Sequence, residues 1–133
     1  MKKKPQTKNV KVLLVEDNPG DARLIEELMK EAEETAHYEL VQVGSLGEAL
    51  RRLGENSFDS VLLDLGLPDS QGLDTLTRMR TKVPQVPVVV LTGLADEAAS
   101  AEAMRMGAFD YLVKGRVDFN VLLRTIRYST ESK

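Results

Sequence analysis

The stretch VLLDLGLPDSQGLD, residues 61–74, begins as an apolar strand and places a carboxylate, Asp64, directly at the end of that strand. A short continuous apolar run of this kind is typical of a strand buried on both faces of a parallel sheet. The loop that follows turns at Pro68 and Gly72. A charge at the edge of a core is costly unless something compensates it. Asp64 therefore requires a compensating partner.

The bulk properties of the chain favour one globular domain in the cytoplasm. Its 133 residues fit a single domain, and its net charge of -3 gives no basis for binding nucleic acid or an acidic membrane surface. The basic start MKKKPQTK lacks the apolar segment of a signal peptide, and no run has the length of a membrane-spanning helix. Cysteine is absent and His37 is the one histidine, so disulfides, thiolate chemistry and multi-histidine metal sites are excluded.

The rest of the sequence alternates between short apolar segments and amphipathic ones. The apolar segments predict β-strands at residues 10–15, 38–44, 58–64, 84–92 and 109–114. The amphipathic segments predict helices from residue 19 to about 32 and at residues 45–53, 72–80, 96–107 and 117–129. This alternation predicts an α/β fold, (βα)5, in which a doubly wound parallel sheet carries helices on both faces.

Local signals refine this picture. Ser45 and Glu48 have the spacing of a capping box at the start of the second helix. The period-two pattern of residues 38–44 indicates a strand near an edge of the sheet. We expect inner helix faces formed by Leu24, Ile25, Leu28, Met29 and Ala32, and by Phe119, Leu122, Leu123 and Ile126. We expect a basic tail over residues 1–9, one domain over residues 10–129 and a short tail over residues 130–133.

Polar residues end four of the five predicted strands: Glu16 and Asp17, Asp64, Thr92, and Lys114. Ligands of open α/β sheets bind beyond the carboxyl ends of the strands, so we expect these residues to converge. Three neighbouring carboxylates repel one another, which raises at least one pKa, and Mg²⁺ relieves that repulsion. A lysine and a hydroxyl beside them suit a phosphoryl group, which a carboxylate can accept covalently. The pattern therefore predicts Mg²⁺-dependent phosphoryl transfer to Asp64.

Taken singly, most of these residues have an ordinary structural explanation. Glu16 or Asp17 alone indicates a helix cap, Thr92 alone a strand-end residue, and Lys114 alone a solvated surface charge. Asp64 is harder to explain in this way, because an apolar loop and no helix follows it. The joint occurrence on four strands of one sheet is what indicates a site.

Four motifs resemble the receiver domain of two-component response regulators, of the chemotaxis-regulator type. They are VLLVEDNPGD (12–21), VLLDLGLPDSQGLD (61–74), VVVLTG (88–93) and GAFDYLVKG (107–115). The resemblance covers about residues 8–128 and implies a flavodoxin-like sheet with strand order 2-1-3-4-5.

The resemblance also implies a role for each site residue. Asp64 would be the phosphoacceptor, charged by a sensor histidine kinase or a phosphotransfer protein. Asp17 would bind Mg²⁺ directly, Glu16 through water, and Gly66 through its backbone carbonyl. Lys114 would pair with the phosphate. Such a protein is not an enzyme beyond its own Mg²⁺-dependent phosphorylation and dephosphorylation.

The resemblance further implies a switch. Thr92 and Tyr111 would shift together and reshape the surface of helix 96–107, strand 109–114 and helix 117–129. That surface would contact a downstream protein or an output domain in a longer chain, and it offers a possible homodimer contact. No nucleic acid or membrane partner is expected for this segment. Without the family, Tyr111 would be interpreted as a half-buried strand aromatic and Gly66 as a flexible loop residue.

One position departs from the family pattern: Gly115 stands where the family usually has a proline after the lysine. Glycine permits many backbone conformations, so this loop is expected to be looser and the lysine less firmly placed. Two residues beyond Thr92, the bulky Leu94 is expected to shield the acyl phosphate from water.

Two other classes of function compete with the phosphoacceptor. One is a degenerate receiver that acts as a phosphorylation-independent binding module. The other is an enzyme or nucleotide binder on a similar fold, but neither a P-loop nor a G-x-G-x-x-G motif occurs. A haloacid-dehalogenase-type phosphatase would need D-x-D after the first strand, where Asp17 is followed by Asn18 and Pro19.

Overall fold

The computed structural model describes residues 8–31 and 36–131, without the side chains of Lys8, Ala36 and Phe119. Two predictions fall outside this part: the burial of Ala32 in the first helix and of the Phe119 side chain in the last. Residues 1–7 of the predicted N-terminal tail and residues 132–133 at the other end also lie outside it.

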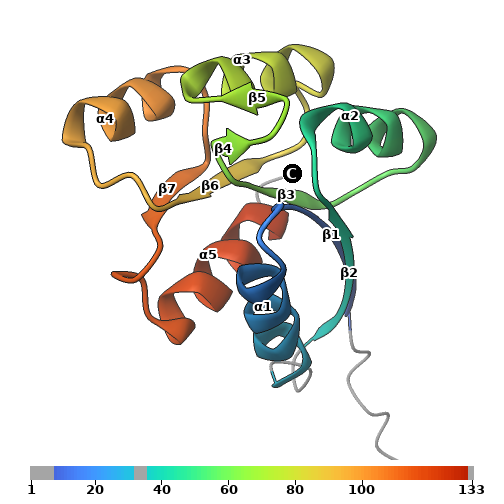
Figure 1. Cartoon of the computed structure of the whole chain (residues 1–133). Helices are drawn as coiled ribbons and strands as arrows, with labels where there is room; N and C mark the ends of the chain where they lie inside the picture. Colours follow the sequence, from blue (N-terminus) through green and yellow to red (C-terminus); the bar gives the residue numbers. More distant parts are fainter. Residues whose placement is uncertain (1–7, 32–35, 132–133) are drawn as a thin grey trace, which may run out of the picture.

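A parallel sheet forms the centre of the molecule, and the described residues contribute five strands to it (Figure 1). In spatial order these are β2 (Ala36–Val43), β1 (Lys8–Val15), β3 (Ser60–Leu63), β6 (Val88–Thr92) and β7 (Asp110–Val113). Two short strands, β4 (Gly66–Leu67) and β5 (Ser70–Gln71), form a separate antiparallel hairpin. Once this hairpin is set aside, the strands follow the predicted order 2-1-3-4-5. The (βα)5 doubly wound fold and the edge position of β2 are confirmed.

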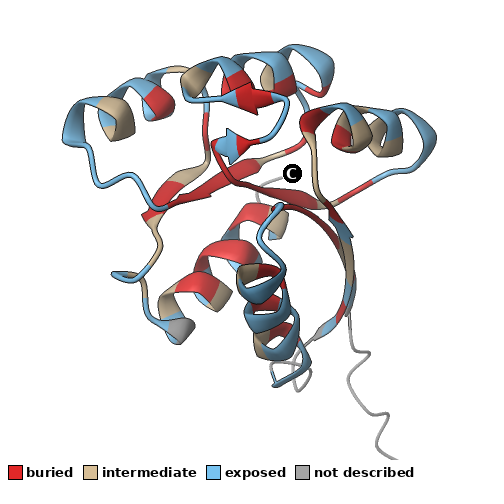
Figure 2. Cartoon of the chain, viewed as in Figure 1, coloured by how far each residue is buried: buried red, intermediate tan, exposed pale blue. Residues whose placement is uncertain are grey.

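The helices lie in two layers, one on each face of the sheet (Figure 1). One layer holds α1 (Pro19–Glu31) and α5 (Phe119–Glu131), and the other holds α2 (Leu46–Glu55), α3 (Leu73–Lys82) and α4 (Glu97–Arg105). Successive strand residues face opposite layers. Leu13 belongs to the core beneath the second layer, and Leu14 to the core beneath α1 and α5. Figure 2 shows the inner strands β3 and β6 buried between two amphipathic layers, which explains why residues 61–63 and 88–91 are all apolar.

Within residues 8–31 and 36–131, no helix combines the length and the apolar character that a membrane span needs. Ser45 caps α2 as predicted, because its hydroxyl accepts a hydrogen bond of 3.2 Å from the Glu48 N–H.

The register of the sheet brings the carboxyl ends of its inner strands to one edge. Val15, the last residue of β1, pairs with Leu63, the last residue of β3, and Thr92 of β6 lies opposite the last residue of β7. The backbone bonds continue one residue further. The Asp64 N–H donates to the Val15 carbonyl at 3.0 Å, and the Lys114 N–H donates to the Thr92 carbonyl at 2.7 Å. The polar residues that follow these strands therefore share one edge.

Several boundaries differ from the predicted ones. β6 begins at Val88 and not at residue 84, because Pro84 and Pro87 have no N–H to donate to a ladder. β1 begins at Lys8, so two residues of the predicted tail belong to the sheet. α5 continues to Glu131, into the predicted C-terminal tail.

Leu24 departs from the predicted inner face of α1. Its side chain is 57% exposed, whereas Ala22, Ile25 and Met29 are buried. Each residue advances about 100° around a helix, so Leu24 lies about 130° from the centre of the stripe through the three buried residues. The prediction that Leu24 lies on the inner face is therefore wrong.

Candidate functional site

Three carboxylates gather at the carboxyl edge of the sheet. Glu16 and Asp17 follow β1, Asp64 follows the neighbouring strand β3, and one carboxylate oxygen from each lies within 4.8 Å of the other two. Glu16 is 1% exposed and Asp64 8%, whereas Asp17 is open to solvent. Oxygen ligands with one side open to water suit a hard cation such as Mg²⁺. The structure thus brings together three acids that the sequence places at two strand ends.

Glu16 is the acid whose ionisation costs most in this cluster. Burial raises the pKa of its carboxyl group, and the negative charge of Asp64 raises it further. Hydrogen bonds from the Lys114 ammonium and from the Asn18 N–H, which lies 3.2 Å from Oε2, act in the opposite direction. The expected rise of one carboxylate pKa is therefore found at Glu16. A bound cation would compensate this buried charge.

Lys114 reaches into the same cluster. Its Nζ lies 2.5 Å from Glu16 Oε1, 2.9 Å from Asp21 Oδ2 and 3.4 Å from Asp64 Oδ2. Burial alone would lower the pKa of this ammonium group. The hydrogen bonds to Glu16 and Asp21 and the charge of Asp64 outweigh burial and raise the pKa above its ordinary value. Lys114 therefore carries a firmly held positive charge beside Asp64.

Asp21 is a further partner of Lys114, outside the three-acid cluster, that the sequence analysis missed. Asp21 lies in the first turn of α1, where an acid favours the helix dipole, and this position by itself indicates no other role. The structure adds an ion pair with Lys114 across 93 residues of sequence. The available signal was weak: Asp21 lies in the first turn of the helix that directly follows the predicted site acids Glu16 and Asp17.

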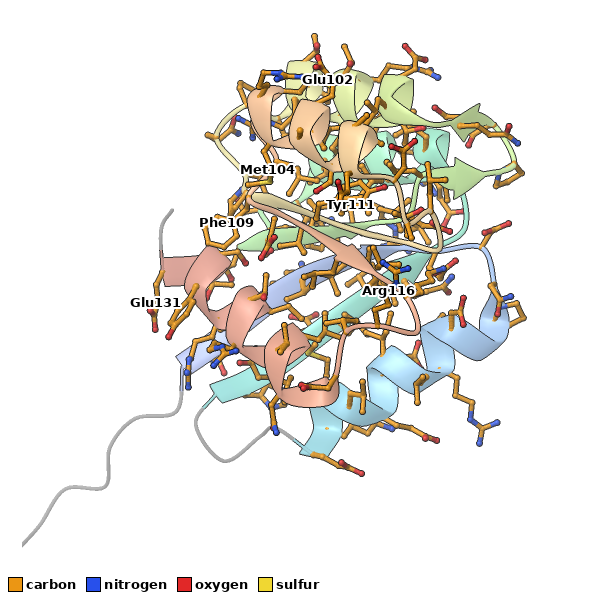
Figure 3. The ribbon with its side chains drawn as sticks, turned by 90° about the vertical axis from the view of Figure 1, so that its left-hand side faces the viewer. Glu102, Met104, Phe109, Tyr111, Arg116 and Glu131 are labelled. Atoms are coloured by element: carbon orange, nitrogen blue, oxygen red, sulfur yellow. The ribbon has the colours of Figure 1, made fainter. Side chains whose placement is uncertain are left out.

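Thr92 and Tyr111 both engage one loop residue, Leu94. The Leu94 N–H donates to Thr92 Oγ1 at 3.3 Å, and the Tyr111 hydroxyl donates to the Leu94 carbonyl at 2.8 Å. Both side chains are buried, and burial together with the charge of Asp96 raises the pKa of the Tyr111 phenol. Figure 3 shows Tyr111 on β7 beneath α4. The two predicted switch residues are therefore joined through the loop between β6 and α4.

The loop after Asp64 folds back toward that carboxylate. The Gly66 N–H lies 3.4 Å from Asp64 Oδ1, and Gly66 begins the β4–β5 hairpin. Asp69 fixes the other end of the hairpin to α2, because its two oxygens accept hydrogen bonds of 2.9 Å from the Leu46 and Gly47 N–H groups. These bonds lower the pKa of Asp69. Sequence reasoning did not single out Asp69, since its partners lie more than twenty positions away.

Gly115 adopts a left-handed backbone conformation, with φ of 84°. A Cβ built at this position would meet no atom within 4 Å. A cavity of about 300 Å³ adjoins it, with α1 and α5 among its walls. Its lining includes Leu24, Ile25, Leu91, Val117 and Leu122, together with Asp21, Lys114 and Gly115. Open space therefore adjoins Gly115, while the Lys114 N–H remains bonded to the Thr92 carbonyl at 2.7 Å.

The part of the chain that matches a known protein family includes the whole site. A family model described as the response regulator receiver domain matches residues 12–127. This range contains every site residue named above, from Glu16 to Gly115.

Individual relatives agree with that match. FleR, a response regulator protein of Pseudomonas aeruginosa, is 38% identical over 104 residues, which are 78% of this chain and 21% of FleR. The chain thus spans about a fifth of the length of that curated relative.

Solved structures place the chain in the same group. A response regulator receiver domain protein from Clostridium thermocellum matches with a TM-score of 0.80 and 30% identity, over 92% of this chain and 95% of that chain. The receiver domain of a sensor histidine kinase from Pseudomonas aeruginosa PAO1, with a magnesium ion coordinated in its active site cleft, has a TM-score of 0.77 and 26% identity. That match covers 92% of this chain and 98% of the other. This chain belongs to the response regulator receiver domain family.

Proposed function

We propose that the chain is a working phosphoacceptor of a two-component system, with Asp64 as the residue that is phosphorylated. The observation that carries the proposal is that one oxygen each of Asp64, Glu16 and Asp17 lies within 4.8 Å of the others, with the Lys114 ammonium 3.4 Å from Asp64. The donor is a phosphohistidine on a sensor histidine kinase or on a phosphotransfer protein. The site is regulatory and acts on no substrate other than its own phosphoryl group.

The transfer needs little more than positioning and charge neutralisation. An Asp64 carboxylate oxygen attacks the phosphorus atom, the P–O bond forms as the P–N bond to histidine breaks, and the imidazole leaving group takes up a proton. Lys114 sits beside Asp64 and pairs with an oxygen of the transferred group. The Thr92 hydroxyl, at the end of the adjoining strand, donates to another oxygen.

The acidic cluster fits Mg²⁺. Asp17 and Asp64 would be direct ligands, Glu16 would act through a water molecule, and Gly66 would supply its backbone carbonyl. When bound, the cation neutralises charge that develops on the phosphoryl oxygens. The solvent-open side at Asp17 leaves room for water ligands.

The phosphoryl group would act on the rest of the molecule through Leu94. If Thr92 turns toward the phosphate, it gives up the Leu94 N–H, and the loop that Tyr111 also holds must change. Tyr111 and this loop border the surface of α4, β7 and α5. A downstream protein, an output domain in a longer chain or a second copy of this chain would bind there in the cytoplasm.

Intact-protein mass spectrometry tests the phosphoacceptor. The protein is incubated with acetyl phosphate, with and without Mg²⁺, as wild type, as Asp64→Asn and as the control Asp74→Asn, which changes an exposed acid of α3. We expect one phosphoryl adduct in wild type and in Asp74→Asn, and none without Mg²⁺ or in Asp64→Asn. Absence of the adduct in every sample would favour the alternative, a binding module that works without phosphorylation.

A further inference from the structure

The ion pair between Asp21 and Lys114 joins helix α1 to the residue that follows strand β7. Asp21 belongs to helix α1, whereas Glu16 and Asp64 follow strands β1 and β3. Its Oδ2 lies 2.9 Å from Lys114 Nζ and accepts a hydrogen bond from it. The lysine ammonium is therefore held from a helix as well as from the sheet edge.

Backbone hydrogen bonds hold the main chain at Lys114, but the backbone of the next residue is open on one side. Gly115 follows Lys114 at a φ of 84°, and the space that a side chain would fill at that position is open. The neighbouring cavity is bounded by Asp21, Lys114 and Gly115 themselves. A lysine side chain has many rotamers, so contacts at the ammonium tip are what fix where Lys114 points.

Two of the three carboxylates around the ammonium also take part in cation binding or phosphoryl transfer. Glu16 and Asp64 lie in the acidic cluster that suits Mg²⁺, and Asp64 is the proposed phosphoacceptor. A cation bound to these two acids competes with Lys114 for their negative charge. Asp21 is outside that cluster, so its hold on the ammonium persists.

We infer that Asp21 is a positioning residue, which keeps the Lys114 ammonium beside Asp64 while Glu16 and Asp64 engage the cation and the phosphoryl group. The inference rests on the proposed function. A rigid residue after Lys114 would restrain the lysine, but residue 115 is glycine. The inference assigns this restraint to the Asp21 side chain on α1.

A purely structural role for Asp21 makes a different prediction. Asp21 lies in the first turn of α1, and its N–H donates to Asn18 Oδ1 at 3.0 Å, so its charge also favours the start of the helix. A role limited to helix stability would leave the mobility of Lys114 unchanged. The test must therefore observe the lysine itself.

The experiment compares wild type, Asp21→Asn, Asp21→Glu and the control Glu26→Gln, which removes one charge from an exposed position of the same helix. NMR follows the order of the Lys114 ammonium group and of the amides of residues 114–118, and mass spectrometry follows the rate of phosphorylation by acetyl phosphate at saturating Mg²⁺. We expect Asp21→Asn to disorder the ammonium and to slow phosphorylation about two- to fivefold, as for a partly exposed charge pair. Asp21→Glu should restore part of both, and Glu26→Gln should change neither.

The direction of the rate change is informative. Loss of a negative charge alone would favour the approach of an anionic donor, so a slower Asp21→Asn variant indicates lost positioning. An Asp21→Asn variant with wild-type ammonium order, or with an undiminished rate, would overturn the inference. If wild type itself is not phosphorylated, the proposed function fails, while the NMR comparison still decides whether Asp21 orders Lys114.

Discussion

The hydroxyl of Tyr111 donates a hydrogen bond of 2.8 Å to the backbone carbonyl of Leu94, seventeen residues earlier in the chain. The N–H of the same residue donates to Thr92 at 3.3 Å. One loop residue is thus held at both of its backbone groups by the two side chains proposed to switch. This arrangement couples the strand end at Thr92 to the face of β7.

Replacing Tyr111 by phenylalanine should loosen this loop. The variant loses one neutral hydrogen bond, so we expect the free energy of unfolding to fall by about 0.5–1.5 kcal/mol. Amide exchange of residues 93–96 should become faster, because their carbonyl anchor at Leu94 is gone. Tyr128→Phe is the matched control, since Tyr128 is half exposed on α5. Equal exchange rates in both variants would show that the Tyr111 hydroxyl does not restrain the loop.

Truncating Leu94 should shorten the lifetime of the phosphorylated protein. The Leu94 side chain lies in the loop between β6 and α4 and is 50% exposed. We expect it to shield the acyl phosphate from water. Both hydrogen bonds at this position use the Leu94 backbone, so Leu94→Ala removes the shield and leaves those bonds in place. The measurement is the half-life of the phosphoryl adduct after the donor is removed. A half-life equal to that of wild type would count against shielding.

Replacing Asp17 by asparagine should weaken Mg²⁺ binding without lowering the stability of the Mg²⁺-free protein. Mg²⁺ at about ten times its dissociation constant should add about 1.4 kcal/mol to the free energy of unfolding of wild type. Asp17→Asn should lose most of this gain and should be no less stable without Mg²⁺, because one of three repelling carboxylates is gone. Thermal unfolding with and without Mg²⁺ measures both effects, and Asp74→Asn should behave as wild type. A full Mg²⁺ response in Asp17→Asn would exclude Asp17 as a ligand.

Removing Asp69 should destabilise the protein in a pH-dependent manner. Its oxygens accept from Leu46 and Gly47, two of the N–H groups that the first turn of α2 leaves without helical partners, so Asp69→Ala should cost about 0.5–2 kcal/mol. Hydrogen bonds from Gly47 and Leu46 lower the pKa of the folded-state carboxyl below 3.8. The stabilisation is therefore complete above that value and is lost as the pH falls through the folded pKa.

Denaturation of wild type and Asp69→Ala across this acidic range measures the effect. The difference between the two proteins should be constant near neutral pH and should shrink below about pH 4. Asp74→Ala serves as the control. A difference that does not change with pH would show that the carboxylate charge has no part in the contact.

The sheet could be predicted from the sequence because its signals are local. Apolar runs, the cap at Ser45 and the acids at the strand ends each lie within a few residues of the element that they mark. The meeting of Glu16, Asp17 and Asp64 then follows from parallel strands whose carboxyl ends share one edge. The predicted start of β6 was four residues too early, because Pro84 and Pro87 look like part of the apolar run.

The remaining features depend on contacts between distant residues. The β4–β5 hairpin has only two pairs of residues, too few for a recognisable alternation. The contact of Asp69 with α2 and that of Asp21 with Lys114 arise only when separate elements pack together. No short window of sequence contains both partners of either contact, so local patterns could not reveal them.

The place of β1 inside the sheet has a consequence for the order of folding. β1 pairs with β2, where Val12 lies beside Leu40, and with β3, where Val12 lies beside Ser60. The second pairing closes the longer loop and is expected to form more slowly. Since the three acids follow β1 and β3, their repulsion arises during this slow step. Stopped-flow refolding should be faster with Mg²⁺ than without it, which would make the acidic cluster a barrier on the folding path as well as a site in the finished fold.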